Sequence, residues 1–91
     1  MKTTMKTKKA SLLRRMRAID SGMESASMMR GADAPECVRV WGIAQDAMSR
    51  ADCAIAAGDW DAAREAMDAA REAMRDHAGM LRGMRGEEAS R

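Results

Sequence analysis

The residues best suited to metal chemistry lie in the last third of the chain, where the single histidine stands among methionines. Met74, His77, Met80 and Met84 recur at three- or four-residue spacing, so on a helix they would lie close together. Thioether and imidazole groups can bind Cu(I). However, Met74, His77 and Met84 also fall on the apolar side of the helix predicted below, and no Cys-x-x-Cys or Cys–His cluster accompanies them. The pattern therefore favours core packing, and we expect no metal and no other cofactor.

Acidic residues in the same stretch are the candidates for acid–base catalysis. Paired carboxylates can transfer protons, but these alternate with arginines at three- and four-residue spacing, which is typical of ion pairs on an exposed helix. No serine or cysteine nucleophile can be tied to a histidine–acid pair, and a glycine-rich phosphate loop is absent. We therefore predict that the protein is not an enzyme. The acidic residues are Asp61, Glu65, Asp68, Glu72 and Asp76.

Positive charge is concentrated at the N-terminus. Seven Lys and Arg residues precede the first acid, Asp20, although the net charge of the whole chain is only +2. Such cations can neutralise nucleic-acid phosphates, but no aromatic residue accompanies them to stack on bases. Nucleic-acid binding is therefore the alternative function, beside an arm that docks on an acidic partner or only aids solubility. The candidate contacts are Lys6, Lys8, Lys9, Arg14, Arg15 and Arg17.

The two cysteines indicate a reducing compartment. Cys37 and Cys53 lie 16 residues apart on one predicted helix, which separates them by about 24 Å. A disulfide needs Cα atoms within about 7 Å, so we expect free thiols and a cytoplasmic protein. No apolar run approaches the roughly 18 residues of a membrane span, and we predict no membrane partner.

A direct repeat reveals the helix that carries most of these residues. AAREAMD (62–68) is followed by AAREAMR (69–75), and this seven-residue period returns each residue type to nearly the same helix face. The repeat predicts an amphipathic helix over 59–85 that packs against another helix. Its apolar face is formed by two columns: Trp60, Met67, Met74 and Leu81, and then Ala63, Ala70, His77 and Met84.

A second helix is predicted over 34–57, immediately before the first. Asp33 is a candidate N-cap, Pro35 suits the first turn, and Glu36 can reach back to the cap. Gly58 would end this helix in a left-handed conformation, and Asp59 would cap the next. Because no residues remain for a loop, the two helices must form an antiparallel hairpin.

A shorter third helix completes the expected fold. Ser11 is a candidate N-cap, and Leu12, Met16, Ile19 and Met23 recur at helical spacing, with a possible break at residues 21–24. We predict an all-α, three-helix bundle built on a long antiparallel helical hairpin. Residues 1–10 would form a flexible basic arm, 11–86 a single helical domain, and 87–91 a tail.

The turn between the two long helices resembles part of a known family. AAGDWDAAREAMDAA, residues 56–70, is similar to the middle of a tetratricopeptide repeat, with an aromatic after Gly-Asp and small residues where the helices touch. Ala47 and Arg50 depart from that family's pattern, and no second copy follows at its 34-residue spacing. The resemblance implies a helical hairpin and suggests peptide or protein binding. The matching positions are Gly58, Trp60, Ala63, Met67 and Ala70.

The function predicted from these patterns is binding. The helix over 59–85 has a wider apolar face than one neighbouring helix would cover, so the excess is a candidate partner surface. We predict a non-enzymatic interaction or regulatory module of the inhibitor or adaptor type, which binds another protein, most simply itself as a homodimer. A monomer that binds a foreign protein is the competing hypothesis. The partner-binding candidates are Ala62, Ala66, Ala69, Ala73 and Met80.

Overall fold

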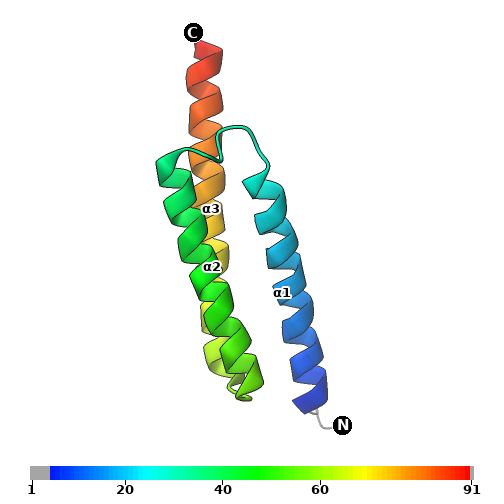
Figure 1. The fold of residues 1–91 in the computed structure, drawn as a ribbon. Helices are drawn as coiled ribbons and strands as arrows, with labels where there is room; N and C mark the ends of the chain where they lie inside the picture. Colours follow the sequence, from blue (N-terminus) through cyan, green and yellow to red (C-terminus); the bar gives the residue numbers. More distant parts are fainter. Residues whose placement is uncertain (1–4, 91) are drawn as a thin grey trace.

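The protein is an all-α bundle of three helices (Figure 1). The computed structural model describes the backbone of residues 5–90 and the side chains of residues 8–84, and this part of the chain contains no strand. The helices are α1 (Met5–Ser27), α2 (Pro35–Ala56) and α3 (Trp60–Ser90). Helices α1 and α3 run in the same direction and α2 runs in the opposite one, so the start of α1 and the α2–α3 turn lie at the same end (Figure 1).

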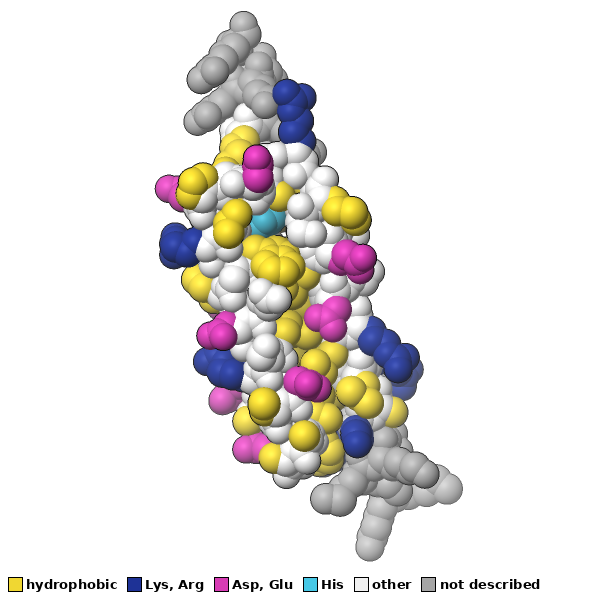
Figure 2. Space-filling model, in the orientation of Figure 1, with side chains coloured by type: hydrophobic (Ala, Val, Ile, Leu, Met, Phe, Trp, Pro, Cys, Tyr) yellow, Lys and Arg dark blue, Asp and Glu magenta, His cyan; other side chains and the backbone are white. Residues whose placement is uncertain are grey.

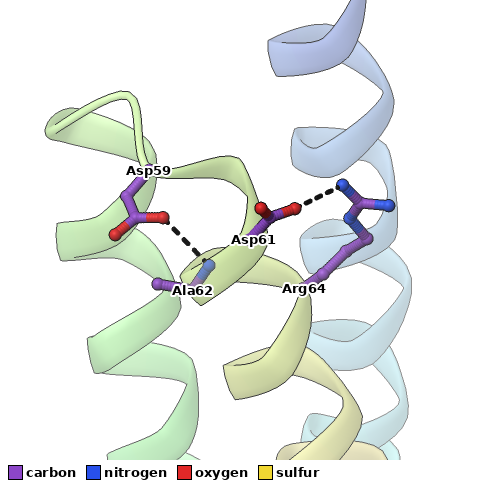
Figure 3. Close-up of polar contacts among 4 residues, drawn as sticks. All are labelled: Asp59, Asp61, Ala62 and Arg64. Carbon is purple, nitrogen blue, oxygen red and sulfur yellow. Dashed lines mark hydrogen bonds and ion pairs between the residues drawn. The ribbon is translucent and has the colours of Figure 1, made fainter.

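The α2–α3 turn forms as the sequence predicts. Gly58 has a φ of 75°, and its N–H donates to the Ile55 carbonyl at 3.0 Å, while the Asp59 N–H donates to the Ala54 carbonyl at 2.8 Å. These two bonds form a Schellman motif, which satisfies carbonyls at the end of α2. Asp59 then caps α3, because its Oδ1 accepts a 3.1 Å hydrogen bond from the Ala62 N–H (Figure 3). The antiparallel hairpin is therefore confirmed.

Alanines allow α2 and α3 to pack closely along the hairpin. The contact buries alanines from both helices completely, and a buried Met67 fills space between them. Small side chains let the helix axes approach, and an unbranched methionine adapts to the remaining gaps. The hairpin is consequently the most tightly packed part of the bundle. The fully covered residues of this seam are Ala44, Ala47, Ala51, Ala63, Met67 and Ala70.

Helix α1 lies along the hairpin and packs mainly on α3. Leu12, Met16 and Met23 are its buried apolar residues. The Trp41 indole Nε1–H of α2 donates to the Met23 carbonyl at 3.0 Å, which links α1 directly to α2. The connection after α1 then closes on α3: Gly31 has a φ of 93°, and a Cβ placed there would lie 3.0 Å from the Met84 sulfur.

Three helix boundaries differ from the sequence predictions. Helix α1 begins at Met5 and continues without a break to Ser27, so residues 5–10 are helical and Ser11 is not its N-cap. Helix α2 is capped by Ala34 with no side-chain hydrogen bond, rather than by Asp33. A proline disfavours helical conformation in the residue before it, and Ala34 is accordingly extended, with φ −60° and ψ 139°, so the cap falls there. Helix α3 continues to Ser90, beyond the predicted end at residue 85.

Candidate binding surfaces

The groove between α2 and α3 combines an apolar floor with a charged rim and has a volume of about 740 Å³. Ile43 is the most exposed of its apolar residues, at 47%. Ala69, Gly79 and Met80 of α3 are half-buried beside it. An apolar centre with a polar rim is the usual arrangement of a protein-binding surface. The rim is formed by Arg39, Arg75, Arg82, Glu72 and Asp76.

This α2–α3 groove contains three of the five residues predicted to bind a partner. Ala69, Ala73 and Met80 line it, although Ala73 is itself buried. Ala62 and Ala66 are half-buried closer to the hairpin turn and lie outside it. The bundle therefore covers part of the predicted surface and leaves a narrower groove. Ile43 was not among the residues predicted from the sequence to bind a partner, although its position three residues after the buried Val40 was a usable signal.

A second groove, of about 520 Å³, lies between α1 and α3. Its charged lining residues are all arginines: Arg15 from α1 and Arg71 and Arg75 from α3. No carboxylate lines it, and none of the three arginines forms an ion pair in the part of the chain that the structure describes. The remaining lining is mostly apolar: Ala18, Ile19, Gly22, Ala26, Met29, Met74, Ala78 and Leu81, together with His77.

His77 is a buried polar residue with unmet hydrogen bonds. Its side chain is 1% exposed, and neither Nδ1 nor Nε2 has a hydrogen-bond partner among the described residues. A neutral imidazole carries one donor and one acceptor, and leaving a buried polar group unsatisfied costs about 1–3 kcal/mol. His77 lies on the apolar face of α3, as its position in the seven-residue pattern predicts. Its lack of partners is a finding of the structure alone.

The methionines near His77 do not gather around it as the Cu(I) hypothesis would require. Met74 lines the α1–α3 groove with His77, whereas Met80 lines the α2–α3 groove on another side of the helix. Met84 lies against Gly31 at the end of the bundle. Among the residues with described side chains, no three His, Cys, Asp or Glu residues are grouped as metal ligands.

The basic residues of α1 are exposed but do not share one face. Lys8, Lys9, Arg14, Arg15 and Arg17 are all exposed, and Lys6 lies outside the residues whose side chains are described. Buried residues of α1 interrupt the series, and Arg15 lines the α1–α3 groove while Arg14 and Arg17 do not. The cations therefore surround the first half of α1 rather than forming a flat basic surface.

The thiols and the acidic residues occupy the environments that the sequence predicts. Cys37 is fully buried, whereas Cys53 is exposed, and both are free. The Arg64 Nη2 donates to the Asp61 Oδ1 at 2.9 Å, and the two side chains form an ion pair on the exposed side of α3 (Figure 3). In the described part of the chain, none of the helices has the length and apolar character needed to span a bilayer.

Apolar side chains also gather on the face where α1 and α2 lie next to each other (Figure 2). Val38 of α2 is 55% exposed and lines a shallow hollow with Trp41, Ala32 and Ser27. This hollow has a volume of only about 270 Å³, so it is a weaker candidate than the two grooves.

Comparison of the chain with protein-family models, curated proteins and solved structures finds no match.

Proposed function

We propose that the protein is a non-enzymatic interaction module that binds a protein partner through the α2–α3 groove. The observation that carries this proposal is Ile43, a large apolar residue left 47% exposed beside an apolar floor. A groove between two helices suits a third helix, whose apolar residues at three- and four-residue spacing would fill it. The module would act as an adaptor or inhibitor in a reducing compartment such as the cytoplasm, in keeping with its free thiols.

A second copy of the chain is the partner that the groove's charges favour. A two-fold contact brings the same surface of both subunits together, so a self-complementary surface must carry both charge signs. The rim of the groove meets this requirement, because Arg39 and Arg82 stand near Glu72 and Asp76. Burying Ile43 and its neighbours from both copies would supply the apolar contribution, at about 25 cal/mol per Å².

Two matched variants test this proposal. Ile43→Glu places a charge in the α2–α3 groove, and Val38→Glu makes the same kind of change on the same helix, at an exposed position outside it. By sedimentation velocity in reductant, we expect the native chain and Val38→Glu to be dimers and Ile43→Glu to be a monomer. A monomeric native chain, with a mass near 9.9 kDa, would reject the homodimer and leave a foreign partner for the groove. Equal dimerisation of both variants would reject the groove itself.

Nucleic-acid binding is the second candidate function. It is favoured by the five basic residues of α1 that are exposed, because they make no ion pair with a described carboxylate. Phosphate contacts by Lys and Arg give affinity that falls steeply with salt. Titration of DNA and RNA at low and high salt, with a Lys8→Gln/Lys9→Gln variant, tests this candidate. Affinity that is absent at low salt, or that does not depend on these lysines, rejects it.

A further inference from the structure

The α1–α3 groove is electrically one-sided. Its charged lining residues are three arginines from two helices, with no carboxylate among the lining residues. Arg71 and Arg75 also stand beside Asp68 and Glu72 on the outer side of α3, but neither acid lines this groove. A groove lined by cations alone attracts a negatively charged ligand. Arginine in particular binds carboxylates through two parallel hydrogen bonds.

The groove is also divided along its length into a charged end and an apolar end. Because α1 and α3 run in the same direction (Figure 1), residue numbers increase the same way on both walls. Arg15 and Arg71 lie at the end of the groove nearer the starts of α1 and α3, and Met29 and Leu81 lie at the opposite end. From Arg71 to Leu81 the helix rises about 15 Å. The apolar end is lined by Gly22, Ala26, Met29, Ala78 and Leu81.

His77 lies where the two ends of the groove meet. Along α3 it follows Arg71 and Arg75 and precedes the apolar end. Its side chain is 1% exposed and both ring nitrogens lack partners. A buried imidazole N–H without a partner is a suitable donor to an anionic oxygen.

We propose that the α1–α3 groove binds a medium-chain carboxylate, with its head at the arginines and its chain at the apolar end. The carboxylate oxygens accept hydrogen bonds from both Arg15 and Arg71 and from the His77 N–H, which satisfies that donor. The chain lies against Ala26, Ala78 and Leu81. A cation would be repelled by the arginines, and a neutral alcohol of the same length would gain only the apolar contact. This site shares only Arg75 with the lining of the α2–α3 groove and does not rest on the function proposed there.

Calorimetric titration with octanoate, below its micelle concentration, tests this proposal on the full chain. We expect saturable binding of one octanoate per chain, and no comparable binding of octanol or octylamine. Arg71→Gln and Arg15→Gln should each weaken octanoate binding by at least about tenfold, the loss of one charge-assisted hydrogen bond. Arg50→Gln is the matched control, because Arg50 is exposed and lines neither groove. It should bind octanoate like the native chain.

The His77→Leu variant tests whether His77 contacts the ligand or only packs in the core. If His77 donates to the carboxylate, this variant should also bind octanoate at least about tenfold more weakly, while retaining the helical circular dichroism spectrum. Ile43→Glu should bind octanoate normally, which keeps this test independent of the α2–α3 groove. The proposal is overturned if octanoate does not saturate, if octanol binds as tightly, or if Arg15→Gln and Arg71→Gln leave the affinity unchanged.

Discussion

Replacing His77 with leucine should stabilise the protein. The imidazole is 1% exposed, and its two nitrogens have no hydrogen-bond partner among the described residues. The folded state therefore loses the hydration of a donor and an acceptor without compensation. Leucine is similar in size and has no polar atom, so it removes this cost while keeping the apolar contacts of the site. The expected gain is about 1–3 kcal/mol in the free energy of unfolding.

Urea denaturation of His77→Leu measures this gain directly. The midpoint should move to higher urea with an unchanged slope, because the surface exposed on unfolding is nearly the same. In thermal unfolding, each kcal/mol corresponds to a rise of about 4–8 °C for a domain of this size. His77→Gln is the matched control: it keeps a buried donor and acceptor, so it should gain no stability. Destabilisation of His77→Leu by about 1 kcal/mol or more would refute the reasoning, since it would mean that the imidazole has a partner such as a buried water.

Two substitutions and one labelling experiment further test the packing of the bundle. Trp41→Phe removes the 3.0 Å hydrogen bond to the Met23 carbonyl and should cost about 1 kcal/mol in urea denaturation, with the loss seen first as faster amide exchange in α1. Gly58→Ala places a side chain on a residue with a φ of 75°, where a Cβ would meet no atom within 4 Å. Its expected cost of about 1–2 kcal/mol in the free energy of unfolding is therefore backbone strain alone. Unchanged stability would contradict the left-handed conformation of Gly58 in the turn. Cys53 is exposed and Cys37 is buried, so a thiol reagent should modify Cys53 quickly and Cys37 only at the rate of unfolding. Equal protection of both cysteines would mean that a partner covers the exposed face of α2.

The hairpin was predictable because its signals are local and agree with one another. The seven-residue repeat gave the buried face of α3, and Gly58 followed by Asp59 gave a turn that the Schellman bonds and the Asp59 cap confirm. The burial of Cys37 and the exposure of Cys53 followed from the same helical periodicity. Each of these features depends on a few neighbouring residues and on the pattern of one helix.

The errors arose where two local signals compete. The charges and threonines of the first ten residues suggested an arm, but lysine, methionine and alanine are good helix formers, and α1 begins at Met5. Asp33 has the ideal side chain for a cap, yet Pro35 fixes the cap one residue later, at Ala34. Charge composition was weaker than helix propensity, and cap preference was weaker than the backbone constraint that Pro35 imposes.

The two grooves could not be predicted because they depend on how the helices are placed. Periodicity shows that Ala69, Ala73 and Met80 lie on one side of α3, but not that Ile43 of α2 stands exposed beside them. Likewise, Arg15 and Arg71 are 56 residues apart in the sequence, and only the parallel packing of α1 on α3 brings them to the same groove.

The most direct test of binding through the α2–α3 groove is an NMR dilution series on the uniformly ¹⁵N-labelled native chain. If two copies meet at this groove, the backbone amide signals of Ile43, Ala69, Gly79 and Met80 should shift as the protein is diluted, and those of Lys9 and Arg17 should not. The test needs no mutation and reports on each surface separately. A spectrum that changes with concentration only in α1, or does not change at all, would contradict self-association through the groove.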